Sequence, residues 1–353
     1  MAIFVKKEGE PRKKMGCLGK TLIGIGLYFG ICFLFGLLMG DMMSTPKTKL
    51  EENTIYRIDL KGTLVEQAGE ENPFDALFAE MYGQSTTTVG LNDLLSNIAL
   101  AKDNDKVLGI YLKGGSLSAG PASAKAIRDA LIDFKQSGKF IIAFADSYSQ
   151  TNYYIASVAD KIFLNPVGSL AWDGLSAEKI YVTRLYEKIG IEMQILKVGT
   201  FKSAVEPYFR TSMSEADRKQ TEQYLGGIWS EMKTAVGQSR QIAAEQLHAY
   251  ADECMSLQPQ EKYLAYNFVD SLVYIQEMDS ILRTYAGTKD YKQLSNSKMT
   301  NVERTEIKAK DKVAVLYADG NIVDNGTGGI VEGDILKTIK KIYKDDDVKA
   351  VVF

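Results

Sequence analysis

The sequence predicts an α/β fold in which a parallel βαβ domain occurs twice in tandem, preceded by one transmembrane helix. Three observations lead to this prediction. Short apolar segments alternate with amphipathic segments across residues 54–300, which is the pattern of strands and helices in a parallel sheet. A helix-then-strand unit that starts at residue 92 recurs at residue 333. A continuous apolar run without charged residues occupies residues 21–40.

The apolar run at residues 21–40 has the length of a membrane-spanning helix. At about 1.5 Å per residue it reaches about 30 Å, the thickness of the hydrocarbon core of a bilayer. The apolar region of a secretory signal peptide is shorter, about 7–15 residues, so we expect an uncleaved signal anchor. Residues 1–20 hold six Lys and Arg against two Glu, which predicts a cytoplasmic basic tail and an exported body. A polar linker, residues 41–53, follows the anchor.

The first domain, residues 54–300, begins with strands and helices in regular alternation. The strands are continuous apolar runs, as expected where helices cover both faces of a parallel sheet. Pro121 suits the first turn of a helix, and a break at Gly62 predicts a turn. Residues 66–88 are polar and irregular, which predicts an exposed insertion. The predicted strands are 54–66, 106–112, 139–145 and 161–165, and the predicted helices are 91–104, 121–135 and 151–158, with a loop at 114–120.

A helical extension is predicted to complete the first domain. Residues 176–189 have helical spacing, and residues 192–198 alternate like a strand. Ser212 and Glu215 have the spacing of a capping box and open a mostly helical stretch that continues to about residue 251. We expect this stretch to be interrupted at three glycines, Gly226, Gly227 and Gly237.

An internal repeat predicts the second domain. Residues 92–112 align without a gap to residues 333–353, at an offset of 241, and an upstream strand around Gly62 matches one around Gly320. Chance similarity explains one shared amphipathic helix, but not a helix, a loop, a strand and an upstream strand in the same order. Residues 311–353 are therefore predicted to begin a second domain. Because a domain rarely ends in a buried strand, we expect this sequence to be a fragment of a longer protein.

The composition excludes several kinds of site. One His and three Cys are too few for a multi-histidine zinc site, a four-cysteine metal site or a disulfide framework. A Ser-His-Asp triad would depend on His248, which lies among charged residues of a predicted helix and is expected at the surface. No G-x-S-x-G nucleophile elbow is present, and GCLGKT at residues 16–21 lacks the spacing of a P-loop. The body after residue 20 is net acidic, which argues against nucleic acid as a partner.

The segment KVGTFKSAVEPY, residues 197–208, stands out chemically. It presents Lys202 after a predicted strand and a glycine turn, beside Phe201 and Val205. A lysine can act as a general base when apolar surroundings lower its pKa from about 10.4 towards about 7–8. Such a base can deprotonate a serine hydroxyl without help from histidine. From the residues alone, a solvated loop lysine is the simpler interpretation.

Four segments carry a family resemblance: ADKIFLNPVGSLAWDGLS (159–176), KVGTFKSAVEPYFR (197–210), RQIAAEQL (240–247) and NFVDSL (267–272). Together they resemble signal peptide peptidase A, also called protease IV, in its long tandem-domain form. The most specific piece, TFKSAVEPY, corresponds to the family segment that contains the catalytic lysine, which implies that role for Lys202. The resemblance also implies a ClpP/crotonase-like fold, a bowl-shaped homotetramer, and no cofactor or metal.

The function that the resemblance implies is a membrane-anchored serine endopeptidase at the bacterial cytoplasmic membrane. A serine and Lys202 would form a Ser-Lys dyad that degrades cleaved signal peptides and other apolar peptides, while residues 21–40 contact membrane lipid. In the family, the serine lies in a Ser-Pro-Gly-Gly-Ser loop after the strand that matches residues 348–353. That loop is absent from this sequence, so the fragment alone is expected to be inactive.

Three alternatives remain open. Ser116 follows two glycines at the equivalent place in the first copy and is conceivable as a substitute nucleophile, although a degenerate loop in a domain without a nucleophile is the favoured interpretation. A membrane-tethered scaffold of the same fold would bind peptides without cleaving them. A crotonase-like acyl-CoA enzyme is disfavoured, because an exported body does not meet cytosolic acyl-CoA. The residues after Phe353 would distinguish the peptidase from the scaffold.

Overall fold

The computed structural model describes residues 47–68, 88–304, 309–324 and 329–353. The chain divides into two compact units, Met1–Thr48 and Lys49–Phe353. The predicted basic tail, signal anchor and most of the linker (residues 1–46) lie outside the described residues, as does most of the predicted insertion (69–87). Within the described ranges, no helix combines the length and apolar character needed to cross a bilayer.

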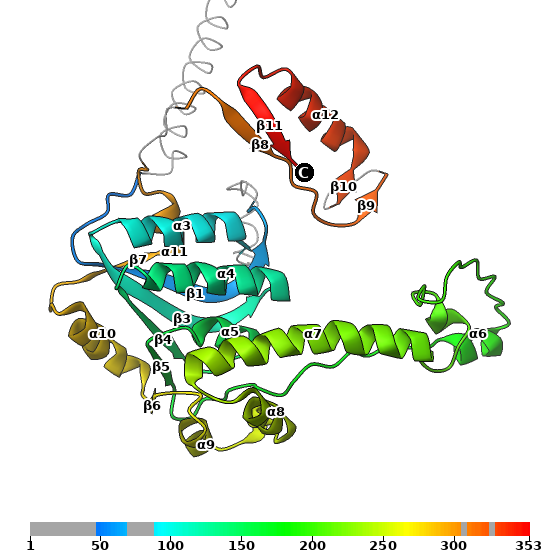
Figure 1. Ribbon diagram of the computed structural model, residues 1–353, viewed down its shortest axis with the longest axis horizontal. Helices are drawn as coiled ribbons and strands as arrows, with labels where there is room; N and C mark the ends of the chain where they lie inside the picture. Colours follow the sequence, from blue (N-terminus) through cyan, green and yellow to red (C-terminus); the bar gives the residue numbers. More distant parts are fainter. Residues whose placement is uncertain (1–46, 69–87, 305–308, 325–328) are drawn as a thin grey trace, which may run out of the picture. The chain divides into compact units, whose positions relative to one another are not determined.

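A parallel sheet of seven strands forms the centre of the second unit (Figure 1). Its strand order is β2-β1-β3-β4-β5-β6, and β7 pairs with the first part of β1. Every pairing in this sheet is parallel, which confirms the prediction from the alternation of strands and helices. The strands are β1 (Thr54–Val65), β2 (Thr88–Gly90), β3 (Val107–Ser118), β4 (Phe140–Ala145), β5 (Lys161–Leu164), β6 (Ser271–Leu272) and β7 (Lys292–Ser295).

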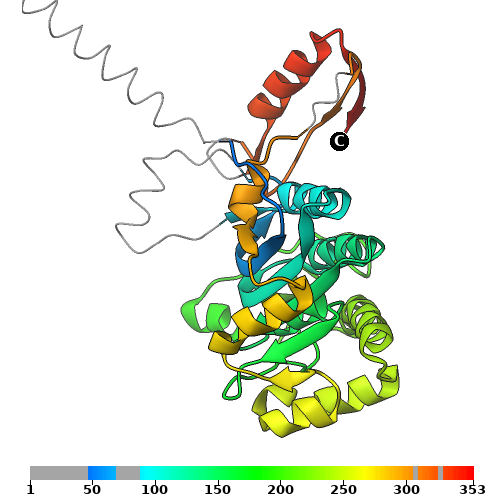
Figure 2. The same cartoon turned by 90° about the vertical axis from the view of Figure 1, so that its left-hand side faces the viewer.

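Helices cover both faces of this sheet (Figure 2). On one face, α3, α4 and α5 pack against Ile110 and Ile141 in the main hydrophobic core. On the other face, Met278 of α10 packs with Tyr111 and Ile142 in a second core. Successive residues of β3 and β4 thus point to opposite faces that are both buried, which explains their continuous apolar sequences. These helices are α3 (Leu91–Asp103), α4 (Pro121–Lys135), α5 (Gln150–Ala156) and α10 (Met278–Ala286).

Strand β3 is longer than the sequence predicts. Residues 114–118, expected in a loop, continue the strand beside β1, with a register shift between Leu60 and Gly62. These residues stay extended because β1 pairs with Gly114 and, beyond the shift, with Leu117 and Ser118. Gly62 is likewise not the end of β1 but an irregularity within it, where the φ of 89° is one that glycine adopts readily. Glycine here marks a bulge rather than a loop.

The segment between β5 and α7 differs most from the sequence prediction. The predicted helix over residues 176–189 is present only as α6 (Thr183–Ile189), and the predicted strand over residues 192–198 does not form. A strand needs a neighbour to satisfy its backbone N–H and C=O groups. No described strand pairs with residues 192–198, so these residues are irregular in spite of their alternating sequence.

Helix α7 (Glu215–Arg240) is one continuous helix, not the interrupted stretch that its glycines predicted. Its N-cap is Ser214, whose hydroxyl accepts the Asp217 backbone N–H at 3.1 Å, so the cap predicted at Ser212 was two residues early. The helix ends where Gln241 adopts the left-handed conformation, at a φ of 57°. The remaining elements of this part are α8 (Ala244–Asp252), α9 (Gln260–Ala265), α11 (Asn296–Thr300) and the short 3-10 helices η1 (Glu206–Tyr208), η2 (Met255–Leu257) and η3 (Ile275–Glu277).

The two copies of the repeat have the same order of elements. In the second copy, β8 pairs in parallel with β11 as β1 pairs with β3, and α12 precedes β11 as α3 precedes β3. The pair β9 and β10 corresponds to the end of β1 and β2. Gly320 has a φ of 106° where Gly62 has 89°. The elements of the second copy are β8 (Lys312–Val315), β9 (Ile322–Val323), β10 (Ile330–Val331), α12 (Glu332–Tyr343) and β11 (Val348–Val352).

Candidate functional site

Lys202 lies in a loop between α6 and α7. As the sequence predicts, the loop begins with a glycine turn: Gly199 has a φ of 97°, and its carbonyl accepts the Lys202 backbone N–H at 3.4 Å. The Lys202 side chain is exposed, and among the described residues none forms a hydrogen bond or ion pair with its amine. Within this part of the chain the amine is therefore accessible.

Two buried carboxylates attach this loop and the chain before α6 to the first turn of α7. The Glu206 carboxylate accepts hydrogen bonds from the backbone N–H and the hydroxyl of Ser214, at 3.1 and 2.7 Å. The Asp217 carboxylate accepts hydrogen bonds from Lys179 Nζ at 2.6 and 2.5 Å. Glu206 therefore ties the loop that follows Lys202 to the N-cap of α7, and Asp217 ties the chain before α6 to the first turn of α7.

Both carboxylates are stabilised in the ionised form. Burial raises the pKa of Glu206, but the hydrogen bonds from Ser214 outweigh it, and the pKa lies below its ordinary value. Burial also raises the pKa of Asp217, but Lys179 and Ser203 outweigh it in the same way. At neutral pH both groups are charged, so the loop is held by charge-assisted hydrogen bonds.

The backbone and aromatic rings hold the other side of the loop. The Val182 backbone N–H donates to the Pro207 carbonyl at 2.9 Å, and the Thr183 hydroxyl donates to the Arg210 carbonyl at 2.6 Å. The rings of Tyr186 and Tyr208 stack with their centroids 6.2 Å apart. These contacts join α6 and the Lys202 loop into one substructure beside the N-terminal end of α7.

Apolar side chains around Lys202 are unusually exposed. Leu196 and Val198 are 97% and 90% exposed, and Phe201, the residue before Lys202, is 55% exposed. Ile180 and Ile189, before and at the end of α6, are 82% and 58% exposed. Exposed apolar side chains in such numbers are typical of a region that binds another polypeptide.

The other sequence candidates have structural positions. Ser116 is exposed in the bulged part of β3, and no described group forms a hydrogen bond with its hydroxyl. His248 is exposed on α8 as expected, and its Nδ1 accepts the indole N–H of Trp229 at 3.2 Å. No described carboxylate pairs with His248. In the described part of the chain, neither residue has the partners that a catalytic nucleophile or its histidine base requires.

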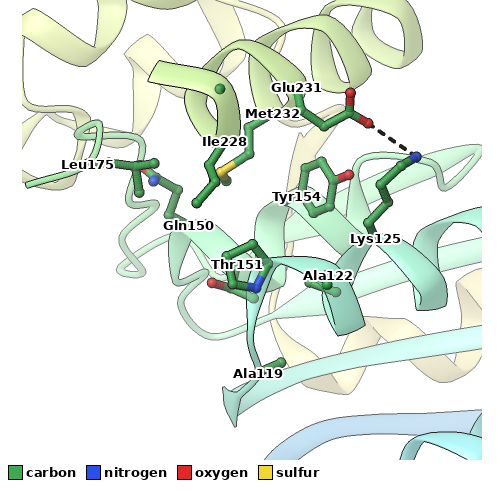
Figure 3. A pocket seen from close by; sticks show the side chains of 13 residues that line it. Ala119, Ala122, Lys125, Gln150, Thr151, Tyr154, Leu175, Ile228, Glu231 and Met232 are labelled. Carbon is green, nitrogen blue, oxygen red and sulfur yellow. Dashed lines mark ion pairs between the residues drawn. The ribbon is translucent and has the colours of Figure 1, made fainter. Parts of the chain in front are cut away.

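A cavity of about 310 Å³ lies between α4, α5 and α7 (Figure 3). Its walls are mainly apolar, and an ion pair between Lys125 and Glu231, 3.2 Å apart, lies at its edge. It adjoins the start of α4, at the carboxyl end of β3, where parallel α/β sheets bind ligands. None of its lining residues is a Ser, Cys or His, so it can accommodate an apolar group but offers no strong nucleophile or imidazole base.

Metal ligands are not clustered in the described ranges. No group of three or more His, Cys, Asp or Glu side chains there is arranged to hold a metal ion. Cys254, the cysteine in the described part, is exposed and free.

Sequence reasoning singled out Lys202, whose role stays a prediction, and did not consider the buried carboxylates Glu206 and Asp217. Glu206 lies within the segment KVGTFKSAVEPY, and an acid among its apolar neighbours could have indicated a buried carboxylate. Asp217 stands three residues after Ser214, which is the spacing of an N-cap and the third residue of a helix. The same spacing between Ser212 and Glu215 offered a competing N-cap in the sequence.

Residues 133–289 match the family model described as Peptidase family S49. This region runs from α4 to α10 and includes Lys202 and the whole of α7. Protease 4 of Salmonella typhi is 31% identical over 348 residues, which cover 94% of this chain. The chain is an SppA-like protein. The S49 match and the parallel α/β sheet together fit the ClpP-like fold expected from the sequence.

Two further relatives are also named as proteases. Protease 4 of Haemophilus influenzae is 27% identical over 360 residues, which cover 96% of this chain. The chloroplastic serine protease SPPA of Arabidopsis thaliana is 22% identical over 325 residues, which cover 88%. The SppA-like chain spans about half the length of these relatives: 54%, 58% and 46% in the order given.

Proposed function

We propose that Lys202 is the general base of a Ser-Lys dyad in a membrane-anchored serine endopeptidase. The observation that carries this proposal is the TFKSAVEPY loop, which lies within the S49 match and presents an amine that no described acid engages. A base must be able to lose its proton, and a carboxylate partner would retain it. The neighbouring Lys179 and Lys197 have such partners, at 2.5 Å from Asp217 and 3.9 Å from Glu206.

In the proposed reaction, neutral Lys202 removes the proton of the serine hydroxyl as the serine oxygen attacks the peptide carbonyl. The lysine ammonium then gives this proton to the leaving amine, so the base is neutral again when the acyl-enzyme has formed. Water hydrolyses the acyl-enzyme by the same two proton transfers. Each transfer needs the amine within about 2.6–3.2 Å of the reacting atom. Backbone N–H groups of a glycine-rich loop would stabilise the oxyanion.

The serine is proposed to lie in the half of the relatives' length that this chain does not span. The family resemblance implies a Ser-Pro-Gly-Gly-Ser loop after the strand that matches β11. The parallel pairing of β8 with β11 supports this, because it gives the second copy the same start as the complete first copy. In this arrangement the first copy supplies the base and the second copy supplies the nucleophile.

Activation of Lys202 requires a cover for its exposed amine. The exposed side chains of Leu196, Val198 and Phe201 support a proposal that another polypeptide surface provides this cover. We include in the proposal a homotetramer in which these surfaces are buried. Burial among apolar groups would then favour the neutral amine that the reaction needs.

The proposed substrates are cleaved signal peptides and other apolar peptides. The apolar surface around Lys202 supports this class, because such peptides gain most from apolar contact. The uncharged run at residues 21–40 supports a location at the bacterial cytoplasmic membrane, with the body on the outer side and lipid around the anchor. No cofactor, metal or nucleic acid takes part in the proposed reaction.

The test uses Lys202→Ala and Lys202→Arg in the natural full-length protein, with hydrolysis of an apolar peptide as the readout. Both variants should lose hydrolysis, Lys202→Arg because a guanidinium remains protonated and cannot act as the base. Lys188→Ala is the matched control, since Lys188 is an exposed lysine of the adjacent α6, and it should retain activity.

A fluorophosphonate probe separates the peptidase from the alternative of a peptide-binding scaffold. The probe should label a serine in the unmodified full-length protein, and labelling should fall strongly in Lys202→Ala. Substantial turnover in either Lys202 variant would assign the base to another residue. Peptide binding without labelling or turnover in the unmodified protein would support the scaffold.

A further inference from the structure

Glu206 is a buried carboxylate of the loop that carries Lys202, and the proposed reaction does not use it. The side chain is 1% exposed. One carboxylate oxygen accepts the Ser214 backbone N–H at 3.1 Å, and the other accepts the Ser214 hydroxyl at 2.7 Å. Ser214 is the N-cap of α7. Both oxygens of Glu206 therefore fasten the loop to the first residue of a 26-residue helix.

The backbone of Glu206 is joined to the backbone of Lys202 by two consecutive turns. The Glu206 N–H donates to the carbonyl of Ser203, the residue after Lys202, at 2.9 Å. The Lys202 N–H donates to the Gly199 carbonyl at 3.4 Å. On the other side, the Glu206 carbonyl accepts the Arg210 N–H at 2.9 Å. A shift of Glu206 relative to α7 would therefore move the backbone that carries the proposed base.

The charge of Glu206 also joins the chain on the two sides of Lys202. Lys197, which precedes the glycine turn, places Nζ 3.9 Å from one carboxylate oxygen and 5.6 Å from the centre of the Phe209 ring. Arg210 places Nε 4.0 Å from the other oxygen. The carboxylate thus engages the cations before and after Lys202. No described acid engages Lys202 itself.

We propose that Glu206 is a positioning residue for Lys202, because its two hydrogen bonds to Ser214 hold the turn that carries the amine against the N-terminal end of α7. This inference rests on the proposed role of Lys202 as the base. The side chain of an exposed lysine rotates about several bonds, so the place of its backbone limits where its amine can reach. A displacement of a reacting group by about 1 Å can cost roughly 100-fold in rate.

The test compares Glu206→Ala with Glu206→Gln in the natural full-length enzyme. Alanine removes both acceptors, whereas glutamine keeps an oxygen for the Ser214 N–H and can donate its amide to the Ser214 hydroxyl. In Glu206→Ala we expect kcat to fall roughly 10- to 100-fold, with a smaller change in KM. Glu206→Gln should recover most of the lost kcat. Glu215→Ala, which removes an exposed acid from the first turn of α7, is the matched control and should change neither quantity.

A variant of the partner residue tests the same contact from the helix. Ser214→Gly removes the hydroxyl and costs the helix cap little, since glycine is tolerated at an N-cap. It should lower kcat roughly 3- to 10-fold, which corresponds to the loss of one hydrogen bond. Added to Glu206→Ala it should cause little further loss, because both changes remove the same interaction.

Amide hydrogen exchange reports on the loop itself. Exchange over residues 199–206 should be faster in Glu206→Ala than in the unmodified enzyme, and close to normal in Glu206→Gln. Thermal denaturation shows whether each variant is folded at the temperature of the assay.

The outcomes separate this inference from the proposed function. An unchanged kcat or unchanged exchange in Glu206→Ala would overturn the positioning role, and so would a Glu206→Gln enzyme as slow as Glu206→Ala. If Glu206→Ala does not fold, an unchanged kcat in Ser214→Gly would overturn it. Retained turnover in Lys202→Ala would instead overturn the assignment of the base, while the exchange measurement would still show whether Glu206 holds the loop.

Discussion

At the scale of single residues, Arg128 on α4 is a side chain with several buried hydrogen bonds. It is 2% exposed, and its guanidinium donates to the carbonyls of Tyr154 and Ala235 and to the hydroxyls of Ser157 and Ser239, at 2.5 to 2.7 Å. These acceptors belong to α5, α7 and the residue after α5. One buried cation therefore joins three helices without a carboxylate partner in the described chain.

Arg128→Ala should lower the free energy of unfolding by about 3 kcal/mol, because it leaves buried acceptors without donors. Urea denaturation of the unmodified and variant proteins measures the difference. Lys125→Ala, one turn earlier on the same helix, is the control: its pairs with Asp129 and Glu231 are exposed, so its effect should be below about 1 kcal/mol. An equal loss of unfolding free energy in the two variants would show that the buried hydrogen bonds of Arg128 add no more stability than an exposed ion pair.

Sequence patterns can indicate a role for a residue when its partners are close in the sequence. They do not when the partners are distant in the sequence. Lys202 could be singled out because its glycine turn and its motif are local in the chain. Arg128 was not, since its contact with Ser239 joins positions separated by 111 residues. Nothing near Arg128 in the sequence marks it as buried, because an arginine on an amphipathic helix is usually solvated.

At the scale of elements, two glycines of α7, Gly226 and Gly237, have different structural roles. An added Cβ at Gly226 would meet nothing within 4 Å, whereas one at Gly237 would lie 2.6 Å from the Ile242 carbonyl. Gly226 is thus only a flexible position in an exposed part of the helix. Gly237 allows the chain after α7 to turn back closely against the helix.

Gly226→Ala should raise the free energy of unfolding by about 0.5–1 kcal/mol, because alanine loses less conformational entropy in a helix. Gly237→Ala should lower it, since backbone must move to admit the methyl group. Thermal denaturation of the two variants under the same conditions tests the contrast. A stabilising effect of Gly237→Ala would show that the contact with Ile242 relaxes at no cost.

The boundaries of some elements were predicted to within a few residues. These elements bury their apolar side chains against segments that are near them in the sequence. Strand β4 and helix α4 are examples, since their apolar patterns match the surfaces that they bury. Residues 192–198 have an equally regular pattern but do not form a strand, because pairing depends on a partner strand. The length of β3 was missed for the converse reason, as β1 pairs with its glycines.

At the scale of the whole molecule, the carboxylate of Asp270 ties strand β5 to the C-terminal end of α7. The Asp270 carboxylate accepts the Ile162 backbone N–H at 2.8 Å and pairs with Arg240 at 3.0 Å, near the end of α7. Burial raises the pKa of Asp270, but these two partners outweigh it and hold the pKa below its ordinary value. Folding therefore favours the ionised form of this group.

The stability of the fold should accordingly fall in acid. The contribution of Asp270 is complete above the unfolded-state pKa of about 3.9 and is lost as the pH falls through the lower folded-state pKa. Urea midpoints measured between about pH 3 and 7 should decline towards low pH, and Asp270→Asn should flatten this decline while lowering stability at neutral pH. An identical pH slope in both proteins would show that other acids account for the decline.

The 26 residues of α7 span about 39 Å at about 1.5 Å per residue. Its C-terminal half is packed through Met232 and Val236, whereas its N-terminal end carries the Lys202 loop. Because the helix is packed at one end only, a tilt of about 1° at the packed end moves the far end by about 0.7 Å. Catalytic groups need placement within about 0.5 Å. The packing of Met232 and Val236 in the main core should therefore limit how far the Lys202 loop at the other end of α7 can be displaced.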